Sequence, residues 1–236
     1  TAGFVIGEDA YRDDALRTTN PNPESYRDAN SQRLYARFAP AGNTADAGWN
    51  AVATLRRSRM DFLQHFLPGQ PTEDNGQDSA ALTLTRYRSS GGLRLTGGLD
   101  LELARGFLEE FQSQPETGTP PRPQGLHYDY SVRQYLAATY LQANWTVAPR
   151  WELSGGVRLE YLLYDYDNRM IAGNTRADGT PCTPACLFNR PADRTDGFLN
   201  LAPNVGLLYR LSERSSAYLT LTRGFRARLS AELYRL

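Results

Sequence analysis

The sequence predicts an all-β protein, namely a fragment of an antiparallel up-and-down transmembrane β-barrel with about nine strands. Three observations predict this fold class. Apolar and polar residues alternate in long runs, these runs exceed the roughly 5–6 residues of an ordinary globular strand, and the connections between them alternate between short and long. The longest uninterrupted apolar run has four residues, whereas a transmembrane helix needs about 20. A helical membrane span is therefore excluded.

The alternation is clearest between residues 132 and 166, where two runs meet at a turn over 148–150. Successive strand side chains point to opposite faces, so each run has one apolar and one polar face. Tyr135 and Trp145 lie near the two ends of the apolar face of the first run. They are roughly 33 Å apart along the strand, and a tilt of about 40° projects this to roughly 25 Å across the membrane, the height of the lipid-facing band of an outer-membrane barrel. We therefore expect the apolar faces to contact lipid.

The same reasoning, applied along the chain, gives the order of the elements. In the 92–104 run, leucines on one face alternate with Arg94, Asp100 and Glu102 on the other. The 198–210 run repeats this pattern, while the runs at 49–60 and 79–88 alternate less regularly. The predicted strands are 3–9, 31–39, 49–60, 79–88, 92–104, 132–147, 151–166, 198–210 and 215–224.

The lengths of the connections indicate how the strands cross the membrane. Tight turns are predicted at 89–91, 148–150 and 211–214, and a turn of intermediate length at 40–48. Outer-membrane barrels have short periplasmic turns and longer extracellular loops, whereas a soluble β-sandwich has turns at regular intervals. We therefore expect the long connections to face the medium; they are 10–30, 61–78, 105–131 and 167–197.

Composition excludes several classes of function. The formal net charge is zero, which gives no support for nucleic-acid binding. All 26 basic residues are arginine, so chemistry that requires a lysine, as in P-loop and Schiff-base enzymes, is excluded. The chain also lacks the Gly-x-Ser-x-Gly and His-Glu-x-x-His motifs. We therefore expect no catalytic residues, no cofactor and no enzymatic activity.

The two cysteines, Cys182 and Cys186, lie in one polar, proline-containing stretch. A disulfide that closes a small loop is the favoured interpretation, because disulfides persist in the periplasm and at cell surfaces. A metal site and a pair of free thiols are the alternatives. Zinc requires four ligands, and the two histidines, His65 and His127, are distant in sequence, so no metal site is predicted.

The C-terminal part of the chain resembles the TonB-dependent outer-membrane receptors. In that family a Gly-Phe-Arg-Ala-Pro run closes a strand in the middle of the barrel, and Glu-Leu-Tyr follows shortly after. Arg228 stands where the family usually has proline, so the exit from this strand is expected to differ. Residues 155–161 and 200–209 also resemble strands of the family. The motif residues here are Gly224, Phe225, Arg226 and Ala227, followed by Glu232, Leu233 and Tyr234.

The resemblance implies that residues 1–236 are the middle part of a receptor barrel in the outer membrane of a Gram-negative bacterium. The partners that it implies are outer-membrane lipid, a plug domain, the remaining strands and the TonB energy-transducing complex. The ligand would be a scarce nutrient, most often an iron–siderophore chelate, with cobalamin, haem and saccharides as open alternatives. A passive porin-type channel and a soluble all-β binding module remain alternative functions.

Ligand-binding candidates come from two positions in the predicted barrel. Aromatic residues at the upper strand ends could stack on an arriving ligand, although ordinary loop packing explains them as well. Charged residues on the polar strand faces could line a ligand route, although cross-strand ion pairing explains those too. The aromatic and loop candidates are His127, Tyr128, Tyr130, Tyr164 and Tyr166, and the charged candidates are Arg158 and Glu160.

Overall fold

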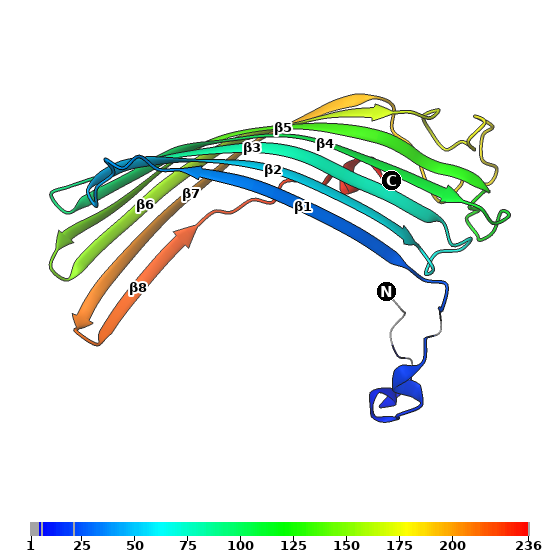
Figure 1. The fold of residues 1–236 in the computed structure, drawn as a ribbon, viewed down its shortest axis with the longest axis horizontal. Coiled ribbons are helices and arrows are strands. Elements are labelled where there is room, and N and C mark those ends of the chain that lie inside the picture. The colour runs from blue at the N-terminus through cyan, green and yellow to red at the C-terminus, as the bar shows by residue number, and fades with distance from the viewer. Residues whose placement is uncertain (1–4, 6, 21, 236) are drawn as a thin grey trace.

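The computed structural model describes residues 5, 7–20 and 22–235. The described chain forms one eight-stranded antiparallel sheet in which every strand pairs with the next along the sequence. Figure 1 shows a single curved sheet with β1 and β8 at its two edges. The predicted all-β, up-and-down architecture is confirmed.

The strands vary greatly in length. They are β1 (Arg27–Phe38), β2 (Ala47–Leu63), β3 (Thr72–Ser90), β4 (Leu93–Gln112), β5 (Gly125–Ala148), β6 (Trp151–Asn168), β7 (Arg194–Ser212) and β8 (Ser215–Thr222). The helical elements are η1 (Ala10–Arg12), η2 (Leu16–Thr18) and α1 (Ser230–Tyr234). Within the described ranges, no helix combines the length and the apolar composition needed to cross a membrane.

The predicted strand at 3–9 is wrong for the residues that the structure describes. Residues 3, 4 and 6 lie outside them, and residues 7–9 form a bend and a turn. Gly7 and Asp9 both have positive φ angles, of 128° and 51°, which a continuous strand does not accommodate. The described sheet therefore begins at Arg27 and contains eight strands.

The strands also reach further into the predicted long connections than expected. The connections left between strands are 64–71, 113–124 and 169–193, so much of 61–78 and 105–131 is strand. These extensions include sequences such as Thr-Glu-Asp-Asn-Gly-Gln at the start of β3. A strand that protrudes beyond the lipid has no need for an apolar face, and the alternation that identifies a membrane-spanning strand then disappears.

The short turns lie at one end of the sheet, here called the short-turn end, and the three connections 64–71, 113–124 and 169–193 lie at the other, the long-loop end. Gly91 and Gly92 form the two-residue turn between β3 and β4, with φ angles of 56° and 79°. Positive φ at both positions is the geometry of a type I′ hairpin turn, which glycine adopts without steric cost.

The outer face of the sheet is apolar and uncovered. Leu153, Val157 and Leu159 of β6 are 41%, 41% and 43% exposed, and no described part of the chain forms a second layer over them. Trp151 and Tyr209 pack at the short-turn end with ring centroids 4.4 Å apart, and Tyr135 and Tyr161 mark the other limit of this apolar band. We treat the strand portions between these aromatic residues as membrane-spanning and those beyond Tyr135 as protruding.

The buried core lies on the opposite, inner face and near the long-loop end. It combines side chains of β4, β5 and β6 with others from the 169–193 connection and from α1. Figure 1 shows the C-terminal segment returning toward the sheet after β8 and ending in α1. The buried members of this core are Leu108, Tyr128, Tyr130, Val132, Leu162, Tyr164, Tyr166, Cys186, Phe188 and Tyr234.

Candidate functional site

Four of the predicted aromatic residues come together on the inner face. Tyr128 and Tyr130 alternate along β5, and Tyr164 and Tyr166 alternate along β6, so all four point to the same side of the sheet. Their exposed fractions lie between 1% and 5%. The rings of Tyr130 and Tyr166 are 5.2 Å apart between centroids. With Tyr234 of α1, these residues are named the tyrosine cluster.

Two segments cover the tyrosine cluster. Tyr234 stacks on Tyr166 with 4.2 Å between ring centroids, and Phe188 of the 169–193 connection lies 5.9 Å from Tyr128. The Tyr164 hydroxyl donates to the Arg228 carbonyl oxygen at 3.0 Å. Two parts of the Gly-Phe-Arg-Ala/Glu-Leu-Tyr motif are joined by an ion pair between Arg226 and Glu232 (2.8 Å). The motif residues therefore build the segment that returns to the inner face.

One hydroxyl of the tyrosine cluster differs from the others in its hydrogen bonding. Within the described residues the Tyr166 hydroxyl is buried and has no hydrogen-bond partner. The Tyr234 hydroxyl, in contrast, donates to Oδ2 of Asp196 at 3.0 Å. A buried unpaired hydroxyl costs free energy, so Tyr166 is the cluster member with unused hydrogen-bonding capacity.

His127 is buried because of a β-bulge. In the pairing of β4 with β5, Glu110 opposes Tyr128 and Phe111 opposes Leu126, so His127 is the extra residue. A bulge re-aims side chains that strict alternation would separate, and both His127 and Tyr128 are therefore buried. The His127 ring stacks on Phe188 at 4.8 Å between centroids. The His127 ring therefore lies beneath the 169–193 connection, and its predicted role in ligand binding stays a prediction.

Beside the tyrosine cluster lies a buried ionic network around Glu110. His127 Nδ1 lies 2.9 Å from Oε1 of Glu110, and Arg122 pairs with the same oxygen. Gln64 donates from Nε2 to Oε2 of Glu110 at 3.0 Å, and Arg235 also pairs with that oxygen. Both carboxylate oxygens are thereby occupied by donors from three separate segments of the chain.

Glu73 extends this network toward β3. Nη1 of Arg235 lies 2.6 Å from Oε2 of Glu73, and Gln64 donates to the same oxygen at 3.0 Å. Two carboxylates therefore face two arginines, Arg122 and Arg235, which balances the buried charge. We name Gln64, Glu73, Glu110, Arg122, His127 and Arg235 the Glu110 network.

The surroundings of Glu110 alter its acidity. Burial by itself raises the pKa of this carboxyl group, but the hydrogen bond with His127 and the charges of Arg235 and Arg122 lower it to about 2. Glu110 opposes Tyr128, beyond the aromatic limit of the apolar band, and so lies outside the membrane-spanning segments. The carboxylate is therefore ionised throughout the physiological pH range.

Sequence reasoning missed the whole of this network except His127. The available signal was the alternation along β4, which continues past 104: Leu108 and Glu110 are buried on the inner face, whereas Glu109 is exposed. A glutamate on a face that is otherwise apolar and buried indicates a paired charge. The partners Gln64 and Arg235 are distant in sequence, and no local pattern identifies them.

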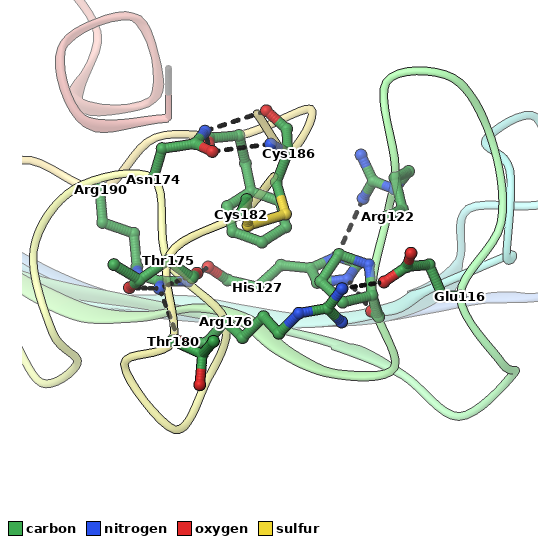
Figure 2. Close-up of a disulfide and its surroundings, with 12 residues drawn as sticks. Glu116, Arg122, His127, Asn174, Thr175, Arg176, Thr180, Cys182, Cys186 and Arg190 are labelled. Carbon is green, nitrogen blue, oxygen red and sulfur yellow. Dashed lines mark hydrogen bonds and ion pairs between the residues drawn. A yellow bond between two sulfur atoms is a disulfide. The ribbon is translucent and has the colours of Figure 1, made fainter. Parts of the chain in front are cut away.

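A disulfide stabilises the 169–193 connection. Cys182 and Cys186 are joined by an S–S bond of 2.00 Å. Figure 2 shows Asn174 beside this bond, where its amide donates to the Cys186 carbonyl oxygen (3.0 Å) and accepts from the Cys186 N–H (2.7 Å). The same close-up shows the ion pair of Arg176 with Glu116, 2.6 Å long, which links this connection to 113–124.

Arg190 attaches the 169–193 connection to the sheet. Its guanidinium is buried and donates to the carbonyl oxygens of Ile171 (3.0 Å) and His127 (2.8 Å), and also to Thr175. The guanidinium carbon lies 5.2 Å from the centre of the Phe188 ring. A charged group held mainly by backbone carbonyls fixes the path of a loop, and this loop is therefore an ordered cover over the tyrosine cluster.

The charged pair predicted for the inner face lies deeper, at the level of the lipid-facing band. Arg158 of β6 pairs with Asp100 of β4 across the intervening strand, and its Nη2 lies 3.0 Å from Oε2 of Glu160. Glu160 is buried and Arg158 is half-buried. Each charge has a partner, so the structure brings these two candidates together but separates them from the tyrosine cluster.

A hollow adjoins both the tyrosine cluster and the Glu110 network. It has a volume of about 290 Å³. Tyr130 contributes an aromatic wall, Glu73 and Arg235 contribute charge, and Ser230 of α1 borders the hollow. Convergent charges beside aromatic walls are typical of small-molecule sites. We therefore take this hollow and its borders as the candidate ligand-facing site.

Comparison with known families identifies the kind of barrel. The family described as TonB dependent receptor-like, beta-barrel matches residues 2–235. The chain belongs to this family. The resemblance noted in the sequence is thereby confirmed. A search of curated proteins finds no match.

Solved structures of other receptors have the same fold. The ferric-catecholate import receptor Fiu from E. coli K12, in its open form, is 15% identical with a TM-score of 0.62; the similarity covers 93% of this chain and 40% of Fiu. The ferric yersiniabactin uptake receptor FyuA from Yersinia pestis is 14% identical with a TM-score of 0.54, covering 81% of this chain and 27% of FyuA.

A third receptor structure also has a fold similar to that of this chain. The siderophore receptor PiuA from Acinetobacter baumannii is 12% identical with a TM-score of 0.53, and the similarity covers 83% of this chain and 32% of PiuA. The chain thus spans at most two fifths of the length of these three structures. At these identities the similarity concerns the fold.

Proposed function

We propose that this chain forms part of the wall of an outer-membrane receptor that imports a scarce nutrient by TonB-dependent, energised transport. The long-loop end faces the medium, and the short-turn end faces the periplasm. The ligand class that we propose is an iron–siderophore chelate. Membership of the receptor family supports the transport role, and the relatives described as ferric-chelate or siderophore receptors support the ligand class.

The observation on which the proposal chiefly rests is the placement of the candidate site. Aromatic rings and buried charges gather on the inner face at the long-loop end, beside a hollow of about 290 Å³. In a barrel this is the mouth of the lumen, where a ligand arrives from the medium. Aromatic walls suit the flat organic part of a chelate.

The residues would have distinct roles in this receptor. Tyr130 and Arg235 line the hollow and would contact the ligand directly. Tyr128, Tyr164, Tyr166 and His127 are buried beneath Phe188 and Tyr234 and would shape the site from behind.

Arg158 and Glu160 face the lumen at mid-height. There they would lie against a plug domain, which occludes the lumen until the TonB complex pulls on it. The plug domain and the remaining strands of the barrel are therefore the intramolecular partners that we propose.

The experiment that tests this function is an uptake assay in a strain that lacks the gene for this protein. Radiolabelled ferric siderophores, cobalamin and oligosaccharides are compared, with the gene restored and with the TonB complex intact or deleted. We expect uptake of a ferric chelate that requires both the gene and TonB. Uptake that persists without TonB would instead indicate a passive porin-type channel, and uptake of another ligand alone would refute the siderophore assignment.

A further inference from the structure

A row of charged side chains crosses the outer face just beyond the apolar band. The cross-strand register places Arg57 opposite Asp78, Asp78 opposite Arg105, Arg105 opposite Arg133, and Arg133 opposite Asp165. Arg57, Asp78, Arg105 and Arg133 are exposed. We name these five residues the charged row.

Apolar residues border the charged row on its membrane side. Two positions along each strand, the next outward-facing residues are Leu55, Ala80, Leu103, Tyr135 and Leu163, which oppose one another in the same order. Outward-facing residues repeat every second position. The charged row therefore lies roughly one step of 6–7 Å beyond the last apolar row, at the level of lipid headgroups.

The positive charges of this row are not fully paired. Asp78 is 2.6 Å from Arg59 and 3.7 Å from Arg57, and Asp165 is 3.6 Å from Arg133. In the described part of the chain no carboxylate lies within ion-pair distance of Arg105, which stands between Asp78 on one neighbouring strand and a second arginine, Arg133, on the other. Like charges directly opposite each other are destabilising, and a bound anion would remove this repulsion.

An apolar groove begins beside the two arginines. Its volume is about 440 Å³, and Ala80, Leu103 and Tyr135 line it together with Arg105 and Arg133. Leu103 is 59% exposed and Tyr135 is 42% exposed. The groove thus joins the arginine pair to the apolar band. Such a surface can bind the charged headgroup and the acyl chain of one lipid molecule together.

We propose that Arg105 and Arg133 bind the phosphate group of an anionic lipid in the outer leaflet, with an acyl chain in the groove over Ala80, Leu103 and Tyr135. Two guanidinium groups provide paired hydrogen-bond donors that match phosphate oxygens. Basic residues at headgroup level are a recognised basis of lipid selection. This inference rests on the proposed placement of the chain in the outer membrane.

The test uses the membrane-embedded protein that carries this chain, extracted in detergent. Arg105→Gln/Arg133→Gln is compared with Arg86→Gln/Arg88→Gln. The control pair is also outward-facing and exposed but lies at the short-turn end, opposite Trp49 and Ala47. Both variants lose the same charge. Native mass spectrometry measures binding of phosphorylated lipid A, and heat-modifiability on gels verifies that each variant is folded.

We expect the Arg105/Arg133 variant to bind phosphorylated lipid A at least about tenfold more weakly than wild type, because both guanidinium groups lose their charge-assisted hydrogen bonds to the phosphate. The control variant should bind as wild type does. Equal loss in both variants, or equal binding of dephosphorylated lipid A, would overturn the proposal. Competition by inorganic phosphate at concentrations equal to those of the lipid would assign the site to free phosphate instead.

Failure of the proposed receptor function can be distinguished from failure of the proposed lipid site. If cell fractionation finds the protein outside the outer membrane, the receptor assignment itself is wrong, whatever lipid A does. If the protein is in the outer membrane and imports its ligand but the arginine pair does not affect lipid A binding, only the lipid site is refuted.

Discussion

Glu110 joins segments that are far apart in the sequence, because its two oxygens accept from Gln64, Arg122 and Arg235. Replacing Glu110 with Gln leaves the buried Arg122 without a counter-charge, while Arg235 keeps only Glu73. Removing one partner of a buried ion pair costs about 3–5 kcal/mol. We expect Glu110→Gln to lower the thermal unfolding temperature of the long-loop end, measured by limited proteolysis. Glu109→Gln, at an exposed neighbouring position, should have almost no effect.

The same carboxylate gives the protein a specific response to acid. Since folding lowers the pKa of Glu110 from 4.5 to about 2, its contribution to stability is complete above about pH 4.5 and is lost as the pH falls toward 2. Wild type should therefore lose protease resistance over this window. A Glu110→Gln variant with the same loss on acidification would show that another group titrates there.

Gly98 is needed because an aromatic ring lies across it. A Cβ atom at this position would be 2.5 Å from the Leu84 carbonyl oxygen and 2.5 Å from Cζ of Tyr140. Gly98→Ala should therefore displace the Tyr140 ring and break its hydrogen bond with Thr85 (2.9 Å), at a cost of about 1–3 kcal/mol.

The matched control for Gly98 is Gly106→Ala in the same strand, whose nearest atom, the Gly76 carbonyl oxygen, is 3.4 Å from the added Cβ. Unfolding of both variants in urea, followed by tryptophan fluorescence, gives the comparison. Equal midpoints would mean that the close approach to Tyr140 has no energetic consequence.

For individual residues, the sequence predicted part of the candidate site. Tyr128, Tyr130, Tyr164 and Tyr166 share a face because strand alternation is a local rule. That rule was not enough for His127, because the bulge that turns it inward depends on its pairing with β4. It also gave no sign that Tyr234 would stack on Tyr166 from 68 residues away, which depends on the path of the chain after β8.

Among the elements, the 169–193 connection differs most from an ordinary loop. It has a defined shape because of the hydrogen bonds of Arg190 and Asn174 and the Cys182–Cys186 disulfide. The presence of a long connection here could be predicted from composition. Its internal order could not be predicted, because the bonds that create it join side chains to backbone groups that are not adjacent in sequence.

Removing the disulfide should loosen this connection without unfolding the sheet. Closing so short a loop reduces the conformational entropy of the unfolded chain, which stabilises the folded loop by about 2 kcal/mol. We expect Cys182→Ser/Cys186→Ser to raise the rate of protease cleavage within 169–193 about thirtyfold, and reduced wild type to behave alike. Thiol counting should find no free thiol in native material. Unchanged cleavage, or two reactive thiols before reduction, would contradict this account of the loop.

The strands themselves could be predicted only where lipid requires alternation. β6 is predicted almost completely by 151–166, because its outer face stays apolar along most of its length. The first residues of β3 have no apolar face and were read as loop. Strand ends that protrude into water therefore lie beyond what residue periodicity can identify.

For the whole molecule, the two faces of the sheet should respond in opposite ways to a new charge. Val157 points outward and is 41% exposed, so Val157→Arg would place a charge in lipid at a cost of about 2–4 kcal/mol near the midplane. Thr83→Arg is the control, because Thr83 opposes Asp100, whose side chain points into the lumen.

Folded, heat-modifiable protein in the outer membrane is the measurement for this pair of variants. We expect a clear loss for Val157→Arg and wild-type yield for Thr83→Arg. If both variants accumulated equally, the outward face would not be facing hydrocarbon.

The overall architecture follows from the same asymmetry. An apolar outer face, a polar inner face and turns that alternate in length require neighbouring strands to pair in order, and the observed sheet is β1 to β8 without a crossover. The fold class could therefore be predicted from the sequence, and the error over the described residues 7–9 concerns only the N-terminal side of the sheet.

Spin labels placed one at a time at residues 153–159 of β6 test the central claim most directly. The measurement is the accessibility of each label to oxygen, which concentrates in lipid, and to a water-soluble relaxation agent. Positions 153, 157 and 159 should show high oxygen accessibility and the intervening even positions low values, a period of two residues. Uniform accessibility along the strand, or labels at 153, 157 and 159 that meet only the water-soluble agent, would contradict the account.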